Sequence, residues 1–163
     1  MRGVGSALTL AMAALAGCAT ASPGGSARTA SSVVYETGPC FGACPIYRVT
    51  VNSDGSGLFE GRRFTAVEGE RAFRVSARQY GALLAHLEPL RPATGTVRYS
   101  GEACETMATD LPSVEVTWRM PGDSQQQLYF YHGCDMERNR AIAERLNAVP
   151  SLLPIEGFIA TPP

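Results

Sequence analysis

The chain has 163 residues, of which 45% are hydrophobic and 18% charged, with 14 basic and 15 acidic side chains. This length fits one compact domain, and the hydrophobic content is too high for a disordered chain. Every basic residue is arginine, and the formal net charge is −1. A balanced charge argues against the one-sided cationic surface that nucleic acids require, so no nucleic-acid partner is expected.

Residues 1–17 predict a signal peptide. Arg2 supplies a short basic region, residues 7–15 are apolar, and Leu-Ala-Gly-Cys closes the segment at Cys18. This ending resembles the lipobox of bacterial lipoproteins, which implies that Cys18 is lipidated and becomes the first residue of the mature protein. The apolar run is well short of the roughly 20 residues that span a bilayer, so a lipid anchor is favoured over a membrane-spanning helix.

The residues after the lipobox predict where the protein lies in the cell. Ala19 occupies the position at which an aspartate would resemble an inner-membrane retention signal, so the expected location in a Gram-negative host is the outer membrane, facing the periplasm. Residues 18–32 are rich in small and polar residues, which predicts a flexible tether. Residues 33–163 then form a single domain that is held at the membrane by its lipid.

The first half of the domain predicts short β-strands. The alternation of Tyr47, Val49 and Val51 with polar residues has the period of two that is typical of a half-buried strand. Asp54-Gly55 favours a tight hairpin turn. Glycines and prolines at residues 38–45 exclude regular structure there. Strands are expected at residues 33–36, 47–52, 58–60, 64–67 and 72–75.

A helix is expected to follow Ser76, which forms a capping-box pair with Gln79. Apolar residues then recur on one helical face at Tyr80, Leu83, Leu84 and Leu87. The prolines at positions 89 and 92 end this helix.

The second half repeats the order of strands and helix. A weak strand at residues 96–99 and an irregular stretch at 100–112 precede a clear hairpin of residues 114–120 and 126–132. Asp135 is the expected N-cap of a second helix. The fold class is therefore α+β, with an antiparallel sheet packed on two helices, and the repeated order is compatible with a ββα/ββα pseudo-repeat.

Four cysteines besides Cys18 are expected to form disulfides in an oxidising compartment, and three pairings are arithmetically possible. Cys40 and Cys44 are separated by three residues across a glycine-containing turn, which brings their Cα atoms within bridging distance. Cys104 and Cys134 flank the open ends of the second hairpin. We therefore expect the pairs 40–44 and 104–134. A four-cysteine zinc site would need close spacing in both halves, and no metal is expected.

Three sequence blocks resemble a bacterial domain family of unknown function, numbered 6438, which occurs in secreted and lipid-anchored proteins. The most specific block is Gly-Pro-Cys-Phe-Gly-x-Cys-Pro at residues 38–45, which a strand and the segment 52–57 follow. Residues 109–112 and 131–134 also match the family pattern. The resemblance covers most of residues 33–150 and implies no activity.

Candidate binding residues lie in the irregular stretches and the aromatic strands. They are Phe41, Tyr47, Asp110, Tyr129 and Tyr131. His86 and His132 could act as general bases, but ordinary packed or surface roles are favoured, and no catalytic residue or cofactor is expected.

These observations favour a non-catalytic binding or structural module that contacts an envelope protein or the cell wall. One alternative is a thiol/disulfide-active envelope enzyme that uses Cys40 and Cys44. Another is a secreted inhibitor that inserts the 38–45 loop into a partner's cleft.

Overall fold

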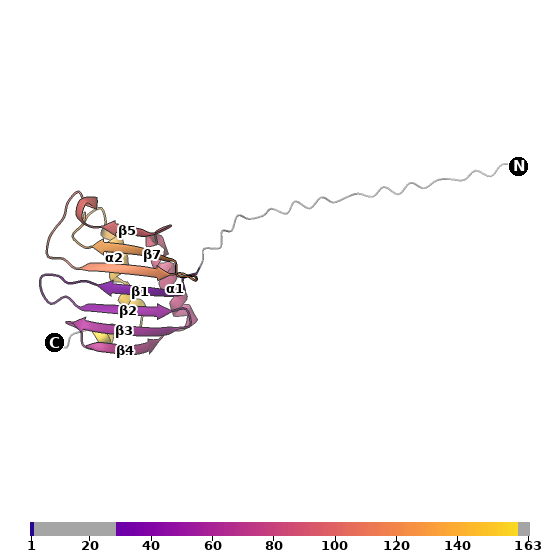
Figure 1. Cartoon of the computed structure of the whole chain (residues 1–163), viewed down its shortest axis with the longest axis horizontal. Helices are drawn as coiled ribbons and strands as arrows, with labels where there is room; N and C mark the ends of the chain where they lie inside the picture. The colour runs from indigo at the N-terminus through magenta and orange to yellow at the C-terminus, as the bar shows by residue number, and fades with distance from the viewer. Residues whose placement is uncertain (2–28, 160–163) are drawn as a thin grey trace.

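The computed structural model describes Met1 and residues 29–159. Residues 2–28, with the predicted lipid site Cys18, lie outside the described residues. Within these limits, one twisted sheet is covered on one face by helices (Figure 1). None of the helices among the described residues is long and apolar enough to cross a membrane.

The sheet has seven strands in the order β4-β3-β2-β1-β6-β7-β5. All neighbours pair antiparallel except β5 and β7, which are parallel. The strands are β1 (Ser32–Thr37), β2 (Ile46–Asn52), β3 (Ser56–Arg63), β4 (Gly69–Arg74), β5 (Thr96–Tyr99), β6 (Ser113–Arg119) and β7 (Gln125–Tyr131). The expected α+β class and antiparallel sheet are confirmed, and β5 is a parallel exception.

Alternating side chains place the core on the face that the helices cover. Tyr47, Val49 and Val51 of β2 are all buried, as their spacing predicted. The residues between them point to the opposite face, where Arg48 forms ion pairs with Glu36 of β1 and Glu60 of β3 at 3.7 Å each. The sheet therefore has one apolar face and one largely polar face.

The helices are α1 (Ala77–Leu87), α2 (Arg140–Asn147) and α3 (Glu156–Ile159). The capping box of Ser76 and Gln79 is present at the start of α1, which confirms that prediction. Tyr80 also donates a hydrogen bond from Oη to the carbonyl oxygen of Ala30 (2.7 Å), and Ala30 is buried. The folded domain thus begins a few residues before position 33.

Two local predictions differ from the structure. Residues 64–67 form bends instead of a strand, because Phe64 adopts a left-handed backbone conformation (φ 57°) that no strand accommodates. Asp135 is not the N-cap of α2. Its φ is 43°, and α2 begins after Asn139. The carboxylate of Asp135 instead serves a distant loop.

The two predicted hairpins lie on either side of β1. The β2–β3 pair flanks it on one side and the β6–β7 pair on the other, while β4 and β5 form the edges (Figure 1). The repetition is inexact, since β4 lies between its hairpin and α1, and β5 precedes its hairpin.

Candidate functional site

Both disulfides lie at the end of the sheet where β1 and β7 finish and β2 and β6 begin. Cys40 and Cys44 bridge within the β1–β2 loop, with their Cα atoms 5.8 Å apart. Cys104, before β6, bridges to Cys134, after β7, across 5.3 Å between Cα atoms. Both predicted pairings are confirmed. We call residues 38–45, 100–112 and 132–138 the disulfide end.

The 38–45 loop is held by backbone contacts as well as by its disulfide. Gly38 donates its N–H to the carbonyl oxygen of Ser113 (2.8 Å), and Phe41 donates to that of Asp110 (3.1 Å). The latter bond joins two of the predicted candidates and ties the 38–45 loop to the 100–112 loop. The side chain of Phe41 is nevertheless 87% exposed. The loop therefore holds an aromatic ring in solvent on a fixed backbone.

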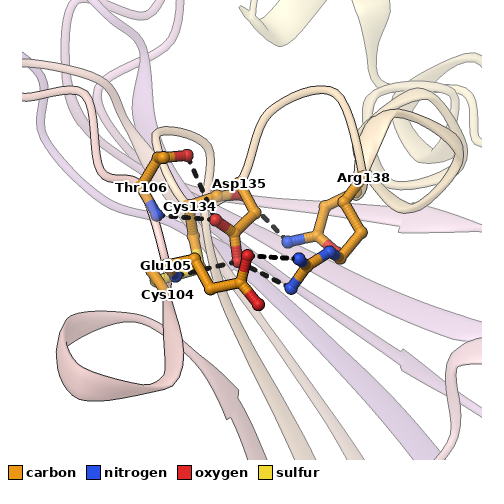
Figure 2. Close-up of a disulfide and its surroundings, with 7 residues drawn as sticks. Cys104, Glu105, Thr106, Cys134, Asp135 and Arg138 are labelled. Carbon is orange, nitrogen blue, oxygen red and sulfur yellow. Dashed lines mark hydrogen bonds and ion pairs between the residues drawn. A yellow bond between two sulfur atoms is a disulfide. The ribbon is translucent and has the colours of Figure 1, made fainter.

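The second disulfide is surrounded by a polar network centred on Asp135 (Figure 2). Its carboxylate accepts the backbone N–H groups of Thr106 (2.7 Å) and Glu105 (3.2 Å) and the hydroxyl of Thr106 (3.1 Å). Arg138 reaches the same carboxylate at 3.5 Å and also pairs with Glu105. The Thr106 N–H, foremost among these contacts, lowers the pKa of Asp135 below its ordinary value. The network fixes the 100–112 loop beside Cys134.

Two further apolar side chains are exposed at the disulfide end. Met107 is 53% and Met136 54% exposed, and both line a shallow pocket of about 490 Å³ beside Asp135. Scattered exposed apolar residues are ordinary on a protein surface, whereas a concentration of them at one place marks a contact surface. Sequence reasoning missed both methionines, and their position in irregular segments near cysteines was the one available signal.

Tyr47 lies in the core and is only 4% exposed. Its ring stacks on Phe59, with 5.3 Å between centroids, and burial raises its pKa to about 12. Together with Tyr35 and His132 it lines a small pocket of about 210 Å³ between the sheet and the last helical segments. Tyr47 is therefore a packed residue, and it does not belong to an exposed aromatic surface.

The other two tyrosines lie on the helix-free side of β7. Tyr129 is covered by the Arg98 guanidinium, 4.0 Å from the ring centroid, within the sheet. Tyr131 lies at the disulfide end, where its hydroxyl accepts the N–H of Leu111 (3.3 Å). Of the five predicted binding residues, the structure thus brings Phe41, Asp110 and Tyr131 together and places Tyr47 and Tyr129 elsewhere.

Neither histidine has the surroundings of a catalytic base. His132 is half-buried edge-on against Phe130, and burial lowers its pKa. The neighbouring Cys134 is bonded to Cys104, so this pair holds no thiol for His132 to activate. His86 contacts the carbonyl oxygen of Arg145 through Nε2 (2.8 Å), which ties α1 to α2.

No group of three or more His, Cys, Asp or Glu residues within 29–159 is arranged to hold a metal ion. Neither a curated protein nor a solved structure matches the chain. One family model does match the chain, over residues 31–150. This range runs from β1 to α2 and includes both disulfides. The chain therefore belongs to the family described as a domain of unknown function (DUF6438).

Proposed function

We propose that this protein is a lipid-anchored, non-catalytic module of the bacterial envelope that binds a partner protein through its disulfide end. The observation that carries the proposal is the exposure of Phe41 on a loop that a disulfide and two backbone hydrogen bonds hold in place. A large aromatic side chain gains nothing from facing water, so its fixed exposure favours a role in contact with another molecule.

Two properties of this loop favour binding. Aromatic residues dominate the energetics of protein interfaces, and truncating one at the centre of an interface costs about 2 kcal/mol or more. The loop is also preorganised, because Gly38 is hydrogen-bonded to β6 and Phe41 to the 100–112 loop. A preorganised loop loses little conformational entropy on binding, which leaves more of the contact energy as affinity.

Met107 and Met136 extend the apolar surface beside the second disulfide. Methionine side chains adapt to irregular shapes, so they suit the margin of an interface around a rigid aromatic anchor. Arg138 and Glu105 add exposed charges near them, which fits the polar rim of a protein interface. A protein partner is therefore favoured over a small ligand.

The membrane anchor is the other half of the proposal. Its support is the lipobox at Cys18 and the small-residue tether that follows it. Metabolic labelling with a clickable palmitate should mark the full chain in its own bacterium and should fail for the Cys18→Ala variant. Equal labelling of both chains, or none of either, would contradict the anchor without affecting the binding surface.

The binding surface is tested with a photo-crosslinking phenylalanine analogue in place of Phe41 in the full chain. We expect one adduct of defined mass, which the Asp135→Asn variant weakens because the neighbouring loop loosens. The matched control places the same analogue at Val97, an exposed apolar residue on β5. Absence of a Phe41 adduct, or identical adducts from both positions, would contradict a dedicated surface.

A second candidate function is thiol/disulfide exchange at Cys40 and Cys44. In its favour, the three residues between these cysteines are exposed and both cysteines are partly exposed, whereas Cys134 of the other bridge is buried. A reduction potential of the 40–44 bridge near those of catalytic disulfides would support exchange, and one below about −300 mV would identify a structural bridge. If the protein were instead an inhibitor that inserts this loop into a partner's cleft, the partner's substrate should compete with the loop and reduce crosslinking at Phe41.

A further inference from the structure

β4 is an edge strand, and its outer side pairs with no other strand among the described residues. It is terminal in the sheet order and lies at the lower edge in Figure 1. It is six residues long and contains no proline, whereas the opposite edge strand β5 has only four residues. Unpaired edges of this kind template pairing with another strand.

The hydrogen bond from the Val75 N–H to the carbonyl oxygen of Gly55 (2.9 Å) shows which backbone groups of β4 face outward. Antiparallel partners alternate between hydrogen-bonded and non-hydrogen-bonded pairs. Since β4 pairs with β3 in continuous register, residues 69, 71 and 73 bond to β3. Glu70, Ala72 and Arg74 therefore direct their N–H and C=O groups away from the sheet.

In one register of two antiparallel β4 strands, the charges of Glu70 and Arg74 on one copy face the opposite charges on the other. If β4 meets β4 of a second copy antiparallel with Ala72 opposite Ala72, Glu70 lies opposite Arg74 in both halves. Both side chains are exposed and lie on the helix-free face. Arg74 donates one bond to the Asp54 carbonyl (3.3 Å), which uses one of five N–H donors.

The same register matches the side chains on the other face of β4. Arg71 then lies opposite Phe73 of the second copy, in a non-hydrogen-bonded pair where side chains approach most closely. The ring of Phe73 lies across Gly57, where an added Cβ would overlap it, so the ring is held in place. An arginine over a phenylalanine ring is a favourable cation–π pair.

Other registers lose these contacts. Sliding by two residues in one direction sets Arg71 opposite Arg71 of the second copy, and sliding the other way removes the pairs of Glu70 with Arg74. Charges on an edge strand normally oppose pairing with a foreign strand. Here the charge pattern opposes foreign edges but fits its own copy.

We propose that β4 pairs antiparallel with β4 of a second copy, centred on Ala72, and joins two seven-stranded sheets into one continuous sheet. This homodimer would use neither the disulfide end nor the membrane anchor. The dimer proposal is therefore independent of the proposed binding function.

The test uses Ala72→Cys in the full chain, in the intact envelope. Directly opposed residues in a hydrogen-bonded pair have Cα atoms about 5.5 Å apart, within the range that a disulfide bridges. We expect a disulfide-linked homodimer under mild oxidation. The matched control is Ala66→Cys, an exposed alanine in the preceding loop, which should remain unlinked.

Charge reversal tests the register. Adding Glu70→Arg to the Ala72→Cys chain should lower the yield of linked dimer about tenfold, because two attractive pairs become repulsive. Adding Arg74→Glu as well should restore it, and Glu102→Arg, the same charge change on another exposed segment, should leave it unaffected. No linked homodimer, equal linking at position 66, an adduct with a different protein, or no rescue by the double reversal would each overturn the proposal.

Discussion

Removing the two disulfides one at a time should destabilise the domain by different amounts. The Cys104–Cys134 bridge spans 30 residues and the Cys40–Cys44 bridge spans 4. Loop-closure entropy predicts about 4 kcal/mol for the longer bridge and about 2 kcal/mol for the shorter one. Replacing each pair by alanine should therefore lower the free energy of unfolding roughly twice as much for Cys104–Cys134.

Urea unfolding measures both losses on one scale. The chain has a single tryptophan, Trp118, and this residue is fully buried in the core, so its fluorescence reports global unfolding. Equal slopes of free energy against urea would show that each variant still unfolds from a compact native state. The chain without Cys40–Cys44 should keep its transition sharp, because Gly38 and Phe41 remain hydrogen-bonded to neighbouring segments.

The comparison can refute the reasoning directly. If the 40–44 variant lost as much as the 104–134 variant, loop length would not be what sets the stabilisation. Local contacts of the 38–45 loop would then be responsible. A variant without either bridge should lose roughly the sum, since the two bridges close segments that do not overlap in the sequence.

The remaining predictions concern the surroundings of the disulfides. The folded pKa of Asp135 is lowered chiefly by the Thr106 N–H, so its contribution to stability is present above about pH 4 and is lost as pH falls through that pKa. Urea unfolding of Asp135→Asn should therefore show less loss below about pH 4 than the parent chain. Burial lowers the folded pKa of His132, so stability should fall as pH drops below about 6.5, its ordinary value, and an NMR titration of the imidazole should show the shift disappear in urea. Gly133→Ala should cost roughly 1–3 kcal/mol in urea unfolding, because its Cβ would overlap the Ala108 carbonyl oxygen. Gly81→Ala, in open space on α1, should raise the free energy of unfolding by roughly 0.5–1 kcal/mol.

The features that sequence predicted well are those with local causes. The alternation in β2, the turn at Asp54-Gly55 and the capping box before α1 each depend on residues within a few positions of one another. The disulfide pairing followed from a short spacing and from the closure of one hairpin. Local chemistry is sufficient to specify such features.

Asp135 shows why the rest could not be predicted. Its position before a helical pattern is that of an N-cap, but its carboxylate bonds to the Glu105–Thr106 backbone, 29 and 30 residues upstream. The Cys104–Cys134 bridge brings that backbone within reach, so the competing partner exists only once the chain is folded. Neighbouring residues alone therefore predict Asp135 as the N-cap of α2.

The sequence also could not show which of the predicted binding residues lie together in the fold. Tyr129, Phe130 and Tyr131 form an aromatic run in which alternation alone does not reveal which face is buried. Pairing with β6 turns Phe130 to the core beside Val114 and leaves both tyrosines on the helix-free side. Exposure of Phe41 was predictable as a loop residue, but its fixation by the Asp110 carbonyl required the fold.

The two proposals together determine how many partners one assembly can hold. A two-fold axis at Ala72 reverses the strand direction between copies, so the two disulfide ends would lie at opposite ends of the joined sheet. One partner molecule could not contact both, and the dimer would present two separate sites for partners that are themselves repeated. Glu70→Arg should then leave the Phe41 crosslink to a single partner intact while it lowers the yield of higher-order adducts about tenfold, as it does for the linked dimer. Loss of the single adduct in that variant would show that the binding surface needs both copies and would refute the separation of the two surfaces.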